Sequence, residues 1–168
     1  MATLADVFRE LNTLKTEGLV HEYAIGGATA VLFYAEPART YDVDVFVSLQ
    51  PSEGSPLVSL SPIYDWARGR GFSLDAEHIL IHGVPVQFLP APNELAEESV
   101  ASARMLTYES VPVRVIGPEH LVALAFQAGG PQRRDRAWLL LRSGNVDREK
   151  LRNLLYSHRI DTNIDDEA

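Results

Sequence analysis

The stretch from residue 24 to residue 47, AIGGATAVLFYAEPARTYDVDVFV, constrains the fold more than any other part of the chain. It joins an apolar run, a Gly-Gly pair and a helix-like segment to a β-branched run that contains Asp42 and Asp44. Residues two apart in a β-strand point to the same face. Both carboxylates are therefore predicted side by side, with Val43 and Val45 on the opposite face. Because Asp is disfavoured inside strands, the pair indicates a chemical role.

Two carboxylates this close repel each other unless a cation lies between them. Mg²⁺ prefers oxygen ligands, and proteins usually hold it with one or two carboxylates together with water and substrate phosphates. Asp42 and Asp44 are therefore the candidate catalytic and metal-binding residues, with Mg²⁺, or Mn²⁺ in its place, as the expected cofactor. The alternative is an acidic face on an exposed edge strand that holds no metal.

Composition limits the classes of function. The chain has 168 residues, of which 46% are hydrophobic, so it can build one domain with a substantial core. Its net charge of −8 opposes tight non-specific binding to nucleic acid, although a local basic groove stays open. The absence of cysteine excludes disulfides and thiol chemistry. The N-terminus does not resemble a signal peptide and no stretch approaches the ~20 apolar residues of a membrane helix, so we expect a soluble cytoplasmic protein without a membrane partner.

Helical and strand patterns mix through residue 116, and helical patterns dominate after it. Helices are predicted over residues 4–16, 28–34, 63–70, 93–103, 119–128, 134–142 and 147–158, with Asn93 and Asp147 as N-caps. Strands are predicted over residues 22–25, 40–49, 72–81, 84–89 and 111–116. These elements predict an α/β (α+β) fold with an α/β core over residues 1–116 and a helical C-terminal subdomain over residues 117–160. The acidic residues 161–168 are predicted to be a disordered tail.

Gly26 and Gly27 stand between a predicted strand and a predicted helix. Two glycines at such a place let the backbone approach a phosphate and turn helix N–H groups toward it. The alternative is an ordinary strand-to-helix turn, and the pair alone does not decide between them.

Two other groups give weaker signals. Arg133, Arg134 and Arg136 form the densest basic cluster and could meet phosphates or RNA, but a solvated helix start is the favoured interpretation. His78 and His82 lie four residues apart across a predicted hairpin. A zinc site there is disfavoured, because the sequence offers no evident third ligand.

The combination of Gly-Gly and Asp-x-Asp resembles the nucleotidyltransferase superfamily, the fold of DNA polymerase β and of minimal bacterial nucleotidyltransferases. Within it, the chain is most similar to relatives of the nucleotidyltransferase toxins of toxin–antitoxin and abortive-infection systems. The matching stretches are YAIGGATAVLFY, ARTYDVDVFV, GVPVQFLP, GPEHLVALAFQAG and RRDRAWLLLRSGNVDREKLRNLL. Together they span the chain from about residue 20 to residue 158.

The resemblance implies a nucleotidyltransferase-like mixed sheet flanked by helices, followed by the helical subdomain. It also implies a set of site residues. Those for nucleotide binding are Gly26, Gly27, Arg39 and Thr40, and those for two Mg²⁺ ions are Asp42 and Asp44.

The sequence departs from the family pattern at two positions. The family carries a third carboxylate on a following strand, and Gln87 stands at the matching position here. A glutamine carbonyl can coordinate a metal weakly, but it cannot deprotonate a hydroxyl nucleophile. A lysine that active toxins often carry on a later helix is matched by Ala125.

The leading hypothesis is a Mg²⁺-dependent nucleotidyltransferase that moves a nucleoside monophosphate from an NTP to a hydroxyl of RNA, such as tRNA, or of protein. The resemblance extends this to a toxin–antitoxin component with an antitoxin partner. The alternative is a catalytically inactive protein of the same fold, acting as a nucleotide sensor or a protein-interaction module, and Gln87 and Ala125 support it. A third interpretation is an α/β domain with an incidental Asp pair.

Overall fold

A computed structural model of the chain describes residues 3–35, 42–49 and 59–165. The strands are β1 (Glu22–Gly26), β2 (Val43–Ser48), β3 (Ser73–Asp75), β4 (His78–Ile81), β5 (Val84–Pro90), β6 (Arg104–Tyr108) and β7 (Val111–Val115). The helices are α1 (Leu4–Thr16), α2 (Gly27–Val31), α3 (Ser61–Gly69), α4 (Glu94–Ala101), α5 (Pro118–Ala128), α6 (Pro131–Arg142) and α7 (Arg148–Ser157). Among these described residues, each helix is too short or too polar to cross a lipid bilayer.

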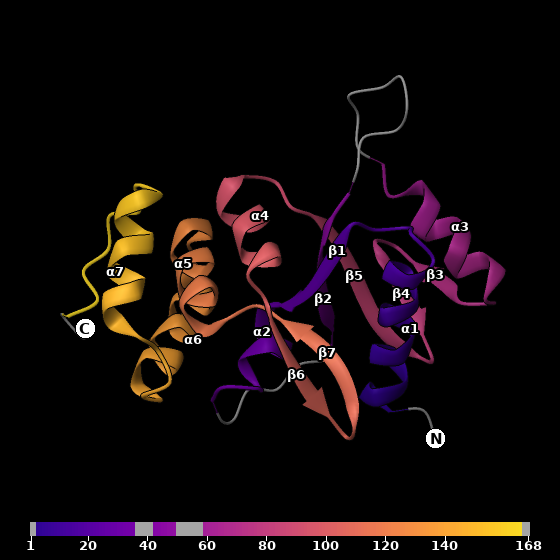
Figure 1. Ribbon diagram of the computed structural model, residues 1–168, viewed down its shortest axis with the longest axis horizontal. Coiled ribbons are helices and arrows are strands. Elements are labelled where there is room, and N and C mark those ends of the chain that lie inside the picture. Colours follow the sequence, from indigo (N-terminus) through magenta and orange to yellow (C-terminus); the bar gives the residue numbers. More distant parts are fainter. Residues whose placement is uncertain (1–2, 36–41, 50–58, 166–168) are drawn as a thin grey trace.

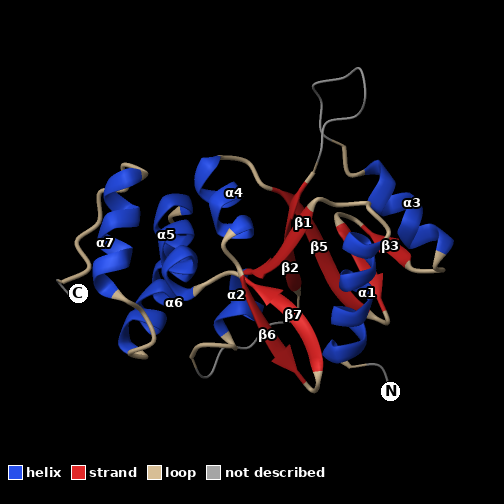
Figure 2. Ribbon diagram, in the orientation of Figure 1, coloured by secondary structure: helices blue, strands red, loops and turns tan. Residues whose placement is uncertain are grey.

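One mixed sheet joins all the strands of the described residues, in the order β3-β4-β5-β2-β1-β7-β6 (Figure 2). β2 pairs with β5 in parallel and with β1 antiparallel, and β1 pairs with β7 in parallel. The predicted mixed sheet flanked by helices is thus confirmed. The Asp-bearing strand β2 is its central strand, which places the candidate site in the middle of the sheet rather than at an edge.

The two faces of β2 have different surroundings. Val43, Val45 and Val47 are fully buried on the face toward α1, where the hydroxyl of Tyr23, opposite Val47, donates a hydrogen bond to Asn12 of α1. The opposite face carries Asp44, and it is only partly buried. The alternation of valine with polar or bulkier residues thus fixes which side chains face the core.

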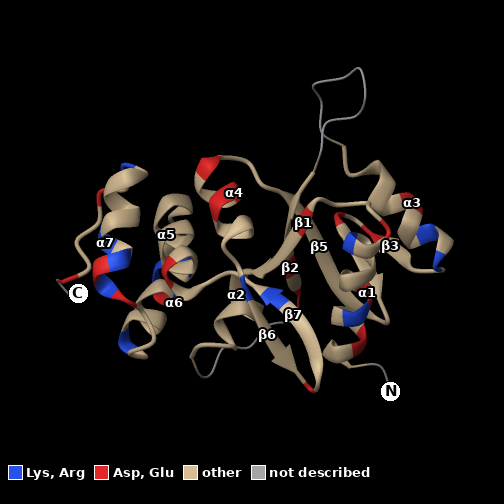
Figure 3. Ribbon diagram, in the orientation of Figure 1, with Lys and Arg blue, Asp and Glu red and all other residues tan. Residues whose placement is uncertain are grey.

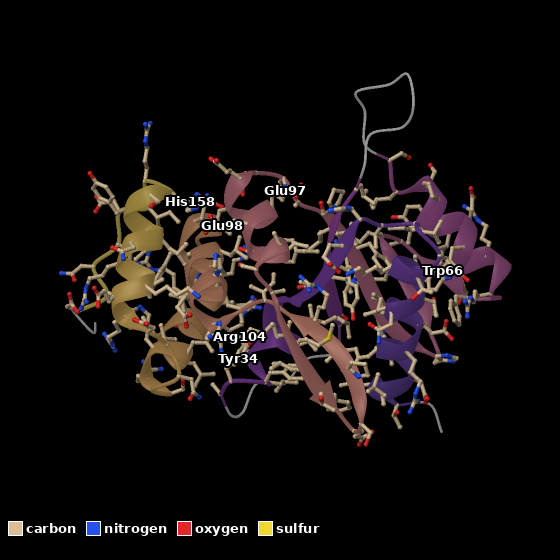
Figure 4. The ribbon with its side chains drawn as sticks, viewed as in Figure 1. Tyr34, Trp66, Glu97, Glu98, Arg104 and His158 are labelled. Atoms are coloured by element: carbon tan, nitrogen blue, oxygen red, sulfur yellow. The ribbon has the colours of Figure 1, made fainter. Side chains whose placement is uncertain are left out.

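The C-terminal helices α5, α6 and α7 gather on one side of the sheet, and α4 lies between them and the strands (Figure 1). Glu98 of α4 accepts hydrogen bonds from Nε2 of His120 on α5, at 3.2 Å, and from Nε2 of His158, just after α7, at 2.8 Å. Figure 4 shows Glu98 and His158 facing each other across these helices. The other charged residues of α4, Glu94 and Glu97, are acidic too, and the helix has no Lys or Arg (Figure 3).

A second polar contact ties the sheet to the helices. Glu119 of α5 is only 2% exposed, and its Oε1 lies 3.6 Å from Arg104 of β6 and 3.3 Å from Lys150 of α7. The guanidinium of Arg104 lies over the ring of Tyr34, which follows α2 (Figure 4). Because a buried carboxylate is costly without partners, this arrangement holds α5 and α7 in place against β6.

Several element predictions need correction. The predicted strand over 72–81 is two strands, β3 and β4, because the chain turns at Ala76, which has φ +55°. The strand β6 was not predicted, and it pairs with β7 through a turn at Glu109 and Ser110, both with positive φ. Side-chain hydrogen bonds to backbone N–H groups confirm the predicted caps Asn93 and Asp147.

Residues 161–165, the described part of the segment predicted to be a disordered tail, contact α7. Ile164 is 2% exposed, and its carbonyl accepts a hydrogen bond from Arg148 at 2.9 Å. Arg152 forms a 2.7 Å ion pair with Asp165. The burial of one apolar side chain, Ile164, accounts for the order of this acidic segment. Residues 166–168 lie outside the described part.

Candidate active site

Asp44 lies inside the Asp-bearing strand as predicted, whereas Asp42, predicted inside the strand over 40–49, lies outside it. Asp42 comes directly before β2 and Asp44 is the second residue of the strand, so both side chains belong to one face. The Asp42 side chain is 51% exposed, whereas Asp44 is half-buried. The pair therefore spans the boundary between solvent and the interior, as a site for a hydrated cation requires.

Asp44 has an unfavourable electrostatic position when no cation is present. Burial raises its pKa, and the nearby carboxylate of Asp42 adds to this effect. Arg136, His78 and Arg133 lower it in part, but the net pKa is above the ordinary value. A divalent cation between the two carboxylates would remove this cost.

Contacts from two separate elements position Asp42. The hydroxyl of Thr29 in α2 donates a 3.0 Å hydrogen bond to the backbone carbonyl of Asp42. Nε2 of His78 in β4 lies 3.5 Å from Oδ2 of Asp42. The first contact fixes the backbone and the second orients the carboxylate, so the residue is positioned from two separate elements.

Close contacts explain why both positions of the Gly-Gly pair, Gly26 and Gly27, are glycine. Gly27 has φ +58°, and a Cβ built there would lie 2.3 Å from Oδ2 of Asp44. A Cβ on Gly26 would lie 2.5 Å from the ring of Phe46. Close packing at the start of α2 thus explains both residues, and Gly27 also borders the cavity described below. Any side chain at residue 27 would displace the Asp44 carboxylate.

A row of side chains crosses the sheet at the level of Asp44. Gln87 of β5 is its direct partner in the parallel pair, and His78 of β4 is in turn opposite Gln87. Gln87 therefore stands next to the Asp pair, at the place the resemblance gives to a third carboxylate. Among the described residues, no group of three or more His, Cys, Asp and Glu side chains is arranged to hold a metal.

His78 is a site neighbour, although the sequence pairs it only with His82 as a disfavoured zinc site. His82 contacts Glu10 of α1 and the ring of Phe72. The local pattern does not reveal the contact of His78 with Asp42, because it depends on the order β4-β5-β2 in the sheet. The sequence signal for His78 is that it is the polar residue of an otherwise apolar strand beside a hairpin turn.

A cavity of about 370 Å³ opens beside Asp44, between the sheet and the helices α4, α5 and α6. Its wall is mostly apolar, and the charged lining residues in the described part are Asp44, Arg133 and Arg136. Asn93 and Gln127 add a pair of amides, joined by a 3.0 Å hydrogen bond. The cavity thus places two cations opposite one carboxylate in a largely apolar space.

This arrangement corrects the interpretation of the basic cluster. Arg133 and Arg136 line the cavity rather than a purely solvated helix start. Arg134 points elsewhere, with its guanidinium 5.9 Å from the ring of Phe126. Ala125 of α5, at the position matched to a lysine, lines the same cavity. The other two predicted nucleotide-binding residues, Arg39 and Thr40, lie outside the described residues.

The order of strands and helices belongs to a known architecture: the chain has the nucleotidyltransferase fold. The sequence matches no protein-family model and no curated protein. The likeness is therefore one of structure, and at 13–16% identity it concerns the fold alone.

Three solved structures illustrate the likeness. The solution structure of the antibiotic-resistance factor ANT(2″)-Ia has a TM-score of 0.54 and 16% identity, over 93% of this chain and 91% of that one. The crystal structure of ANT(2″)-Ia in complex with adenylyl-2″-tobramycin has a TM-score of 0.56 and 16% identity, over 94% and 98%. An antigenic nucleotidyltransferase-like protein from Paracoccidioides brasiliensis has a TM-score of 0.57 and 13% identity, over 93% and 88%.

Proposed function

We propose that the protein is a Mg²⁺-dependent nucleotidyltransferase that transfers a nucleoside monophosphate from an NTP to a hydroxyl of RNA or protein. The observation that supports this most is the position of Asp42 and Asp44, on one face of the central strand and beside a cavity lined by two arginines. Carboxylates for the metal and cations for the phosphates are the two requirements of this chemistry.

The proposed reaction forms one bond and breaks one. The acceptor oxygen attacks the α-phosphorus of the NTP, the bond to the bridging oxygen breaks, and pyrophosphate leaves with that bond's electron pair. Asp42 and Asp44 would hold Mg²⁺, which supplies charge neutralisation for the triphosphate and lowers the pKa of the attacking hydroxyl. Since Gln87 cannot accept the hydroxyl proton, that proton passes to solvent.

The remaining residues have positioning roles in this proposal. The absence of a side chain on Gly27 keeps the space beside Asp44 open, and Gly26 lets the turn into α2 pack on Phe46. Arg39 and Thr40, just ahead of Asp42 in the sequence, are proposed to line the same pocket from the resemblance alone. The proposal places the protein in the cytoplasm, where NTPs and Mg²⁺ are abundant, as a toxin with an antitoxin partner.

A second candidate function is a nucleotide sensor or protein-interaction module without catalysis. It is favoured by Gln87, which occupies the direct neighbour position of Asp44 where a carboxylate base would stand. Two carboxylates and the arginines could still bind a metal–nucleotide complex under this hypothesis. The two functions differ in whether a covalent product forms.

One experiment separates the two functions. The purified protein is incubated with each of four α-³²P-labelled NTPs, Mg²⁺, and total cellular RNA and protein, beside the double variant Asp42→Asn/Asp44→Asn. The proposal expects label transfer that the double variant abolishes, and the labelled species identifies the acceptor. Nucleotide binding measured by calorimetry without any transfer would support the sensor instead.

A further inference from the structure

Two arginines on one face of α6 are directed into the cavity beside Asp44. Arg133 and Arg136 lie three residues apart, so they share a side of the helix. On the same side, Ala137 and Leu140 also line the cavity, and both are at most 1% exposed. The apolar packing of α6 therefore fixes the direction in which the two guanidinium groups point.

These arginines differ from most others in the described residues because they have no carboxylate partner. Arg70, Arg104 and Arg114, for example, each form an ion pair within 4.0 Å. Arg133 makes only a long hydrogen bond, 3.5 Å, to the carbonyl of Gly129, and Arg136 forms no ion pair in the described part. Arg136 is nonetheless half-buried. Removing a guanidinium from water without an anionic partner is costly, unless a ligand supplies the anion.

The facing wall has room for such an anion. Asp44 lines the same cavity as Arg133 and Arg136. Ala125 of α5, where the resemblance would place a lysine, contributes only a methyl group. The space between the carboxylate and the guanidinium groups therefore suits a group that binds both a metal on Asp44 and cations on α6.

We infer that Arg136, assisted by Arg133, binds the triphosphate of the incoming nucleotide from α6, and so supplies the positive charge that α5 lacks at Ala125. This inference rests on the proposed function and adds the residues that hold its donor substrate. A guanidinium donates two parallel hydrogen bonds to phosphate oxygens, which an ammonium cannot do. Phe46, Leu89 and Leu121 form apolar wall that suits the base beyond the phosphates.

The test measures binding rather than turnover. Calorimetry with Mg²⁺ and inorganic tripolyphosphate reports on the phosphate site without any base, and MgATP, MgGTP, MgCTP and MgUTP follow. The variants are Arg136→Gln and Arg133→Gln, with Arg134→Gln as control. Arg134 lies on the same helix and its loss changes the net charge equally, but it lies over Phe126 and does not line the cavity.

We expect Arg136→Gln to weaken tripolyphosphate binding by on the order of tenfold or more, as for the loss of a charge-assisted hydrogen bond. Arg133→Gln should have a smaller effect, because Arg133 is more exposed. Arg134→Gln should bind like the wild type. Arg136→Lys restores the positive charge and should recover part of the affinity. Thermal melting curves of the variants show whether a loss of affinity comes from unfolding instead.

Three outcomes would overturn the inference. The first is no binding of tripolyphosphate by the wild-type protein. The second is wild-type affinity in Arg136→Gln. The third is an Arg136→Gln variant that loses affinity for a short single-stranded RNA but keeps wild-type affinity for tripolyphosphate. That result would assign the arginines to the acceptor.

The fate of the proposed function is read separately. Label transfer that depends on Asp42 and Asp44, together with unchanged phosphate binding in Arg136→Gln, would refute the inference and keep the function. Arginine-dependent binding of tripolyphosphate without label transfer would keep the inference and refute catalysis.

Discussion

Gln87 lies directly opposite Asp44 across the parallel pair of β2 and β5, on the face that carries the candidate site. Its amide is the nearest cross-strand neighbour that could be exchanged for a third carboxylate without moving the backbone. Because of this register, a substitution at Gln87 can test whether a third carboxylate improves metal binding.

Gln87→Asp should raise the affinity for Mg²⁺ by on the order of tenfold, because a third carboxylate oxygen adds a ligand of the kind that Mg²⁺ prefers. Without metal, the same change should lower the Tm, since three carboxylates would repel one another. Calorimetric titration and thermal melting measure the two effects. Gln132→Asp, on the exposed start of α6, makes the same charge change away from the site. An equal response in both variants would show that net charge alone is responsible.

Gly27→Ala should abolish Mg²⁺ binding, since the new Cβ would lie 2.3 Å from Oδ2 of Asp44. It should also cost about 1–2 kcal/mol of folding free energy, because the residue keeps a positive φ. Gly18→Ala is the matched control: Gly18 has φ +75° with nothing within 4 Å of the added Cβ. The control should lose similar stability and keep metal binding. Metal binding that survives in Gly27→Ala would argue against Asp44 as a ligand.

Asp44→Asn should raise the Tm at pH 7 in the absence of metal. Burial raises the pKa of Asp44, so its ionised form destabilises the native state above the ordinary value of 3.8. The gain should disappear as the pH falls below 3.8, where the wild-type residue is protonated in both states. Added Mg²⁺ should stabilise the wild type but not the variant. Asp75→Asn, on the exposed strand β3, should show neither effect.

Glu98→Gln should lower the Tm near neutral pH and lose this effect in acid. Burial tends to raise the pKa of Glu98, but hydrogen bonds from His158 and His120 outweigh it and the net pKa lies below 4.5. A lowered carboxylate pKa gives stability above the unfolded value that is lost as the pH falls through the folded one. Melting curves at pH 5.5 and pH 3 measure the difference. Glu97→Gln, its neighbour on α4, should change neither; a pH-independent loss would refute the role of ionisation.

Local sequence patterns are enough to predict the arrangement of the two aspartates at the candidate site. Strand periodicity placed Asp42 and Asp44 on one face, and the valines between and after them on the other, as the buried positions show. Most helices can also be predicted, because apolar spacing and N-caps such as Asn93 are visible within short stretches of sequence. These features depend on neighbours within a few residues.

What the sequence analysis missed depends on distant pairing. The strand β6 begins with Arg104 and lacks a regular buried pattern, and its turn at Glu109 and Ser110 lacks the glycine that usually marks a hairpin. His78 and Arg136 lie 36 and 94 residues from Asp42, and only the sheet order and the packing of α6 bring them to the site. A charged residue at a helix start looks the same in sequence whether it faces solvent or a cavity.

The charged residues that line the cavity in the described part come from two elements: β2 carries Asp44, and α6 carries Arg133 and Arg136. Substitutions of the two arginines leave the sequence of β2 unchanged. Exchanging residues 131–142 would therefore change the proposed phosphate-binding arginines while Asp44, the proposed metal ligand of β2, stays in place. The residues proposed for phosphate binding and those proposed for metal binding can therefore be exchanged separately on this scaffold.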